Sequence, residues 1–134
     1  RGQGRVLVVD DDPLALALMH STLLSIGIAS HGVPGGREAL VELERWRPDA
    51  IILDLMMPEL DGFAVLAALR QLPQCADVPV FIWTSMELSD EEYGRLSRSA
   101  LAIINKGGGE LAGMLEQLRR WRPPAALDLQ SRPA

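Results

Sequence analysis

The chain has 134 residues, a formal net charge of −5 and 48% hydrophobic residues. A chain of this length forms one domain, and it can bury roughly two thirds of the surface that its unfolded form exposes. The acidic balance argues against a nucleic-acid-binding surface, whose usual footprint is a basic patch. Since the sequence also contains neither a membrane-span-length apolar stretch nor a signal-peptide pattern, we expect this domain to contact neither nucleic acid nor membrane.

The single cysteine, Cys75, cannot form an internal disulfide, so we expect a reducing, cytoplasmic location. It lies in a loop-like segment with no histidine nearby, which makes a catalytic thiol the weaker interpretation. The chain does not begin with Met, and we interpret residues 1–4 as a linker or tag remnant. Three prolines follow the last helical pattern, so we expect residues 122–134 to form a flexible tail. The predicted domain is residues 5–121.

Strand-like apolar runs alternate with helical patterns along this domain. Asp12 and Pro13 form a helix start, an N-cap aspartate followed by proline at the first helical position. In the helix that follows, the residues that recur near helical spacing are Leu14, Leu18, Thr22 and Ile26, before a terminating Gly27. Five such alternations predict an α/β fold, a doubly wound parallel sheet with helices on both faces. The predicted strands are Val6–Asp10, Ile28–Val33, Ala50–Asp54, Val80–Thr84 and Ala102–Asn105, and the predicted helices are Pro13–Ile26, Gly35–Trp46, Phe63–Leu72, Asp90–Ser97 and Glu110–Trp121.

Chemically active side chains follow four of these strands. Asp10 and Asp11 come at the end of the first strand, Asp54 after the third, Thr84 at the end of the fourth and Lys106 after the fifth. Parallel strands end at one edge of the sheet, where ligands bind in open α/β folds. Crowded carboxylates there repel one another unless a cation or proton lies among them. This inventory fits Mg²⁺-dependent phosphoryl transfer, which needs positioning and charge neutralisation.

These segments resemble the receiver domain of the two-component response-regulator family, in the family's order and spacing, over about residues 5–120. The resemblance implies a flavodoxin-like fold with strand order 2-1-3-4-5. Glycine after the last lysine also resembles the receivers that are fused to hybrid histidine kinases. The matching segments are Val6-Leu-Val-Val-Asp-Asp-Asp12, Asp54-Leu-Met-Met-Pro-Glu-Leu-Asp-Gly62, Thr84-Ser85 and Lys106.

The resemblance implies a role for each acidic position. Asp54 would be the phosphoacceptor, taking its phosphoryl group from a phosphohistidine of a histidine kinase or histidine phosphotransfer domain. The carboxylates of Asp11 and Asp54 would bind Mg²⁺, with the backbone carbonyl of Met56 as a third protein ligand. Asp10 would support the metal directly or through water. Such a domain catalyses its own phosphorylation and a slow dephosphorylation, but it acts mainly in signalling.

The resemblance also implies roles for the remaining strand ends. Thr84 would donate a hydrogen bond to a phosphoryl oxygen, Lys106 would pair with Asp54 or its phosphate, and the small Ser85 would leave room for that group. The partner would dock on the acidic edge and on the first helix, and a homodimer is also allowed. The apolar contacts expected from that helix are Leu14, Ala15, Leu18 and Met19.

Three departures from the family pattern bear on mechanism. Gly107–Gly109 replace the proline that usually follows the lysine, so we expect a trans peptide bond and a loose loop. Ile103 stands where a Tyr or Phe usually forms half of the conformational switch. Met56 and Met86 flank the expected path of the hydrolytic water, and thioethers orient water poorly. The methionines predict slow self-dephosphorylation.

Two alternatives remain open at this point. A degenerate receiver would use the fold only for protein interaction, independently of phosphorylation. A haloacid-dehalogenase-like phosphatase also uses an aspartyl nucleophile, but it requires an acid at position 56, which is Met here. Other features have simpler interpretations: Asp12 is an N-cap, and Met56 and Met57 are packing residues. We expect both histidines, His20 and His31, to lie on the surface.

Overall fold

The computed structural model describes residues 5–108 and 111–121, so the predicted linker and tail lie outside the described residues. Five strands form one parallel sheet in the order β2-β1-β3-β4-β5, which confirms the predicted fold class and strand order. The described residues also contain two short 3₁₀ turns, η1 (Pro73–Cys75) and η2 (Lys106–Gly108). The strands are β1 (Arg5–Val9), β2 (Ala29–Val33), β3 (Ala50–Leu53), β4 (Val80–Thr84) and β5 (Ala102–Asn105), and the helices are α1 (Pro13–Ser25), α2 (Gly36–Leu43), α3 (Gly62–Arg70), α4 (Asp90–Ser97) and α5 (Leu111–Trp121).

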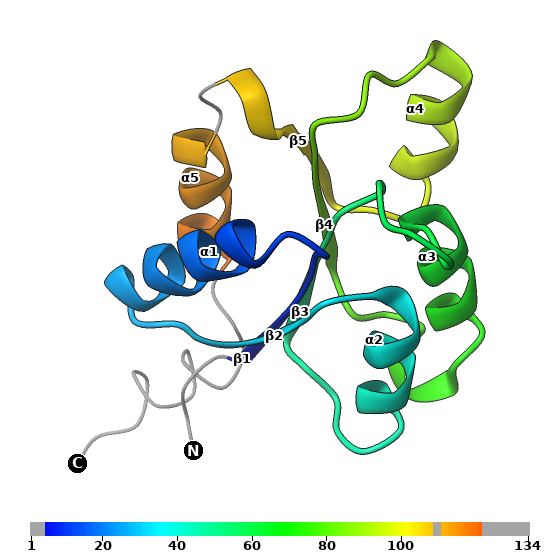
Figure 1. Cartoon of the computed structure of the whole chain (residues 1–134), viewed down its shortest axis with the longest axis horizontal. Helices are drawn as coiled ribbons and strands as arrows, with labels where there is room; N and C mark the ends of the chain where they lie inside the picture. The colour runs from blue at the N-terminus through cyan, green and yellow to red at the C-terminus, as the bar shows by residue number, and fades with distance from the viewer. Residues whose placement is uncertain (1–4, 109–110, 122–134) are drawn as a thin grey trace.

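The sheet lies between two layers of helices (Figure 1). Helices α1 and α5 cover one face, and α2, α3 and α4 cover the other. Side chains of one strand alternate between these layers, as in Val8, which packs with the α1–α5 cluster, and Val9, which packs with the opposite cluster. Burial on both faces explains why β1, β3 and β4 are almost continuously apolar. In the described part of the chain, we find no helix with the length and apolarity to cross a membrane.

Helix α1 begins as predicted, because the Asp12 side chain accepts a hydrogen bond from the backbone N–H of Leu14 at 3.0 Å. The chain leaves the helix at Gly27, whose φ of 81° favours glycine. Leu14 and Leu18, which recur at helical spacing in the sequence, are 78% and 48% exposed and lie on the solvent side of the helix. Two residues predicted to offer docking contacts, Ala15 and Met19, therefore face the core instead. The buried residues of α1 are Ala15, Met19 and Leu23.

Two helices are shorter than their sequence patterns suggest. Helix α2 was expected to reach Trp46, and α3 to reach Leu72. In both cases the last turn tightens: the N–H of Arg45 bonds to the carbonyl of Glu42, and the N–H of Leu72 to that of Leu69, three residues back instead of four. The tightened turn after α3 leads into η1, which buries Cys75 rather than leaving it in an open loop.

The start of α3 is pressed against the backbone that carries Asp54. The Asp61 side chain caps the helix by accepting from the N–H of Ala64 at 2.9 Å, and the N–H of Gly62 donates to the carbonyl of Leu55 at 3.1 Å. A Cβ added at Gly62 would lie 2.3 Å from the Asp54 carbonyl oxygen and 2.7 Å from the Leu55 Cα. Only glycine permits this approach, which fixes the loop after β3 against α3.

We predict that Gly62→Ala lowers the free energy of unfolding by about 1–3 kcal/mol, the usual cost of forcing extra volume into a packed site. The new methyl group meets backbone atoms, which cannot rotate away as a side chain can. Urea unfolding followed by far-UV circular dichroism measures this change.

The matched control is Gly94→Ala in α4, where an added Cβ has no heavy atom within 4 Å beyond its own helix and chain neighbours. Alanine there should raise the free energy of unfolding by up to about 1 kcal/mol, because it favours the helix. Equal free energies of unfolding for the two variants would contradict the close packing at Gly62.

Candidate functional site

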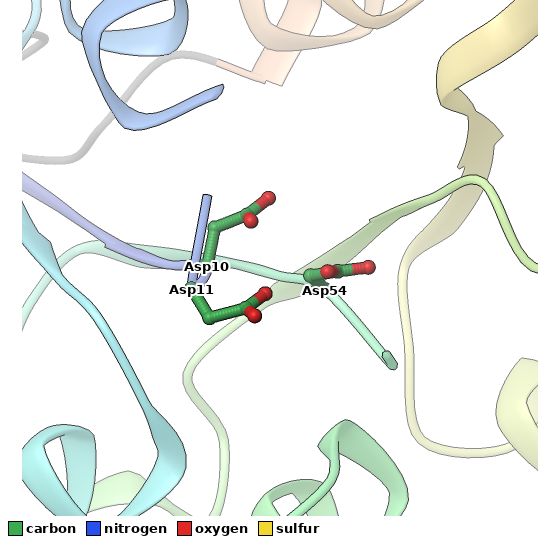
Figure 2. Close-up of side chains that lie close together, drawn as sticks. All are labelled: Asp10, Asp11 and Asp54. Carbon is green, nitrogen blue, oxygen red and sulfur yellow. The ribbon is translucent and has the colours of Figure 1, made fainter. Parts of the chain in front are cut away.

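The pairing of β1 with β3 brings the two acidic strand ends together. Val9 is the register partner of Leu53, so the next residues, Asp10 and Asp54, leave neighbouring strands at the same level. The N–H of Asp54 continues this ladder by donating to the Val9 carbonyl at 3.0 Å. Figure 2 shows the carboxylates of Asp10, Asp11 and Asp54 gathered at this edge. The sheet therefore places the predicted acidic residues in one site.

This acidic cluster has the chemistry of a site for a hard divalent cation. Each of Asp10, Asp11 and Asp54 offers a carboxylate oxygen that lies within 4.8 Å of the other two. Two ligands on opposite sides of Mg²⁺ lie about 4.2 Å apart, so small side-chain adjustments suffice. Asp54 is 4% exposed, and its Oδ1 is buried without a hydrogen-bond partner among the described residues. A bound cation would satisfy that oxygen, and the all-oxygen donor set suits Mg²⁺, Ca²⁺ or Mn²⁺.

Lys106, in the turn after β5, supplies a positive charge next to these carboxylates. Its Nζ lies 2.6 Å from Asp10 Oδ2 and 3.6 Å from Asp54 Oδ2, and its side chain is 19% exposed. The family resemblance implied that Lys106 pairs with Asp54 or its phosphate, and in this structure the closer carboxylate is that of Asp10. Lys106 therefore bridges the two buried carboxylates.

Asp10 is the most deeply buried of the three acids, with 1% of its surface exposed. Its Oδ1 accepts a hydrogen bond from the N–H of Asp12 at 3.0 Å, while its Oδ2 accepts from Lys106. Burial raises the pKa of the Asp10 carboxyl above its usual value, and the hydrogen bonds from Lys106 and Asp12 partly oppose that effect. Because both of its oxygens already accept hydrogen bonds, Asp10 is better suited to a supporting role at a metal site than to being a main ligand.

The other predicted positions lie around this cluster. Thr84, at the end of β4, is buried, and its Oγ1 accepts from the N–H of Met86 at 3.2 Å. Ser85 is exposed, and its Oγ lies 3.8 Å from the Met56 sulfur. Met56 is exposed and was wrongly predicted to be a packing residue, whereas Met57 is buried as expected. The Met56 side chain therefore lies at the solvent side of the site.

Ile103, in the place of the usual aromatic residue, borders an open groove. The groove has a volume of about 620 Å³ and extends from Thr84 along β5 to Tyr93 of α4. Ile103 is partly buried against the core on the α3–α4 side. Isoleucine has no aromatic ring, so the groove lacks the aromatic side chain that the family resemblance leads one to expect at this position.

Both histidines are exposed, as predicted, and they lie on other parts of the surface. His20 Nδ1 is 2.9 Å from Ser30 Oγ, and His31 Nε2 is 3.5 Å from a carboxylate oxygen of Glu42. Neither contact involves a residue of the acidic cluster. A phosphohistidine role for these side chains therefore has no support in the site geometry.

One neighbour of the site was missed by sequence reasoning. The Nζ of Lys106 lies 4.9 Å from the centroid of the Trp83 ring, in cation–π range. The available signal was the strand register: Trp83 pairs with Ile104, and Lys106 follows two residues later on the same face. Residue spacing alone does not show that two such side chains meet.

Residues 6–112 match the sequence model of the family described as "Response regulator receiver domain". The chain belongs to this receiver family. It is 41% identical over 96 residues to the transcriptional regulatory protein PrrA of Mycobacterium leprae, covering 72% of this chain and 40% of that protein. It is 36% identical over 122 residues to the response regulator MprA of Mycolicibacterium vanbaalenii, covering 89% and 52%. The chain thus spans about half or less of these curated relatives.

Solved receiver structures share the fold. One is the receiver domain of a sensor histidine kinase from Pseudomonas aeruginosa, solved with a magnesium ion coordinated in its active site cleft; it has 27% identity and a TM-score of 0.77, covering 89% of this chain and 97% of that one. Another is the receiver domain of a signal transduction histidine kinase from Syntrophus aciditrophicus, with 27% identity and a TM-score of 0.77, covering 98% and 96%. Membership of the receiver family decides against the haloacid-dehalogenase-like alternative.

We predict that Asp54→Asn raises the thermal midpoint of unfolding in EDTA. The change removes one of three crowded carboxylates, while Lys106 keeps its closer pair with Asp10. The expected gain is on the order of 1 kcal/mol, the usual size of the stability change from a single substitution. Asp77→Asn, at an exposed surface ion pair with Arg47, should leave the midpoint almost unchanged.

Adding MgCl₂ should shrink or reverse this difference. The wild-type protein gains binding free energy that the variant partly loses, about 2.7 kcal/mol when the free metal is at roughly a hundredfold its Kd. Differential scanning calorimetry with and without the metal measures both effects. The same ranking and spacing of midpoints in EDTA and in MgCl₂ would count against a cation site that includes Asp54.

Proposed function

We propose that this chain is a phosphoacceptor receiver domain in which Asp54 takes a phosphoryl group from a phosphohistidine in an Mg²⁺-dependent reaction. The observation that carries the proposal is the Asp54 carboxylate itself, which is buried, has one oxygen without a hydrogen-bond partner among the described residues, and lies beside both Asp11 and Lys106. A carboxylate held in this way is costly unless a cation or a reacting group satisfies it.

In the proposed step, an Asp54 carboxylate oxygen attacks the phosphorus of the phosphohistidine. The new O–P bond forms as the N–P bond breaks, and the bonding electrons stay on the imidazole nitrogen, which leaves as neutral imidazole after protonation. Mg²⁺, held by Asp11, Asp54 and the Met56 backbone carbonyl with support from Asp10, would neutralise charge on the phosphoryl oxygens.

The remaining residues of the site would stabilise the transferring group. The Lys106 ammonium, already shared between Asp10 and Asp54, would pair with a phosphoryl oxygen. The buried Thr84 hydroxyl would donate a hydrogen bond to another phosphoryl oxygen. Apart from the Asp54 nucleophile, phosphoryl transfer depends mainly on positioning and electrostatic stabilisation, which Lys106, Thr84 and the metal would provide.

The proposed donor is a histidine kinase or a histidine phosphotransfer domain. Two similar solved structures are receiver domains of histidine kinases, which supports this class of donor and is in keeping with the Lys106-Gly107 sequence. The docking surface would combine the acidic edge with the exposed side chains of α1, Leu14 and Leu18, in place of the four residues first expected. We also propose a cytoplasmic location, where the free thiol of Cys75 stays reduced.

The second candidate is a degenerate receiver that acts only as a phosphorylation-independent interaction module. Ile103 and Gly107 favour it, because both replace elements of the family's usual switch. The intact cluster of Asp10, Asp11 and Asp54 with Lys106 favours phosphorylation.

We predict that incubation with MgCl₂ and phosphoramidate adds one phosphoryl group to the intact chain, seen by mass spectrometry. Asp54→Asn should abolish the adduct, because an amide is a poor nucleophile at phosphorus, whereas the surface variant Asp77→Asn should retain it. Omission of the metal should slow the reaction strongly. A wild-type protein that takes no phosphoryl group and binds no beryllofluoride would favour the degenerate receiver instead.

We predict that the phosphorylated domain loses its phosphoryl group slowly, and that Met56→Asn speeds this loss. An amide can hydrogen-bond a hydrolytic water, and one such bond contributes about 1 kcal/mol, or roughly fivefold in rate. Met56→Leu keeps an apolar side chain and should remain slow. The decay of the adduct after removal of the phosphodonor measures the rates. Loss from the wild-type domain within minutes at neutral pH would contradict the prediction.

A further inference from the structure

Lys106 directly follows β5 and begins the short turn η2, where the N–H of Gly107 donates a hydrogen bond to Asn105 Oδ1 at 2.7 Å. Lys106 is the only lysine of the 134-residue chain, and Gly107–Gly109 follow it directly. The turn positions the Lys106 backbone, but the four-carbon side chain of a lysine is flexible and the turn does not fix its end. The ammonium must be held in the site by groups that it touches.

Three groups hold that ammonium. Two are carboxylates, Asp10 at 2.6 Å and Asp54 at 3.6 Å. The third is the ring of Trp83, whose centroid lies 4.9 Å from Nζ. Trp83 belongs to β4, the strand that pairs with the one preceding Lys106, and it is 4% exposed, so its ring is fixed by the core around it.

Burial of the Trp83 indole in this core makes an unfavourable contribution to the free energy of folding. Its Nε1 is buried and has no hydrogen-bond partner among the described residues. A leucine would fill apolar volume without burying an unpaired N–H group. The property of tryptophan that a leucine lacks is the electron-rich face, and among aromatic rings indole binds cations best. That face is directed at the Lys106 ammonium.

We propose that Trp83 is a positioning residue for phosphoryl transfer, which acts by holding the Lys106 ammonium over its ring and between Asp10 and Asp54. The ring restrains the end of the flexible lysine side chain, which the turn at its backbone does not fix. It also leaves the hydrogen-bonding capacity of the ammonium for oxygens, since a cation–π contact uses no particular N–H. The role assigned to Lys106 rests on the proposed function, whereas the contact between ring and ammonium does not.

The contact is testable without any phosphorylation. Lysine-selective ¹³C labelling gives a single side-chain Cε signal, because the chain has one lysine. In the unmodified protein the Cε protons should be shifted upfield by the ring current of Trp83. The shift should vanish in Trp83→Leu and persist in reduced form in Trp83→Phe. Trp46→Leu is the matched control, since Trp46 faces Arg5 outside the site, and it should leave the signal unchanged.

The same variants test the effect on the reaction with phosphoramidate and MgCl₂. Trp83→Leu should slow the appearance of the phosphorylated mass about fivefold, which corresponds to roughly 1 kcal/mol of lost transition-state stabilisation. Trp83→Phe should recover most of this rate, because it restores a ring face. Trp46→Leu should react at the wild-type rate, although it also loses a tryptophan beside a cation.

Different failures have different meanings. A wild-type Lys106 signal without an upfield shift, or a folded Trp83→Leu protein that reacts at the wild-type rate, would overturn the inference. A wild-type protein that shows the shift but takes no phosphoryl group would overturn the proposed function and leave the ring contact standing. If Trp83→Leu does not fold, Trp83→Phe decides: it should keep a shifted signal, and loss of the shift in this folded variant would reject the contact.

Discussion

The structure depends on a charge imbalance at one edge of its sheet. Three carboxylates gather there, those of Asp10, Asp11 and Asp54. The ammonium group of Lys106 lies close to two of them, Asp10 and Asp54. Two of these acids are buried, where repulsion between like charges is screened less than in water. Much of the fold serves to hold this arrangement: the register of β1 and β3 brings the acids together, and Gly62 fixes the loop that follows Asp54.

The fold could be predicted from sequence because local and global signals agree. Continuous apolar runs that end in charged residues are typical of strands buried on both faces. The helix start predicted at Asp12 and Pro13 was confirmed in the structure. The inward face of α1 was not predictable in the same way. Leu14, Ala15, Leu18 and Met19 are all apolar, so periodicity offers two adjacent stripes. Packing against the sheet decides between them, and in the structure the buried residues are Ala15, Met19 and Leu23.

Some features of the acidic site could likewise be predicted from the sequence, and others could not. Topology alone predicts that strand ends converge, so the meeting of Asp10, Asp54 and Lys106 could be foreseen. The choice of Lys106 between two carboxylates depends on about an ångström, 2.6 Å against 3.6 Å, which is far less than the spacing of neighbouring strands. The contact between Trp83 and Lys106 was missed for a related reason. It joins a residue of β4 to one in the turn after β5 that is not its direct register partner. Residue type and spacing do not resolve such distances.

Thr84 is linked to the loop before α4 by a hydrogen bond that does not involve the Ile103 side chain. The Thr84 hydroxyl accepts a hydrogen bond from the N–H of Met86, in the loop that leads to α4. A hydroxyl can accept and donate at the same time. Under the proposed function, Thr84 would donate to a phosphoryl oxygen while Met86 remains bonded to it. Any movement of Thr84 toward that oxygen would then pull on the loop before α4 through the backbone, independently of the side chain at position 103.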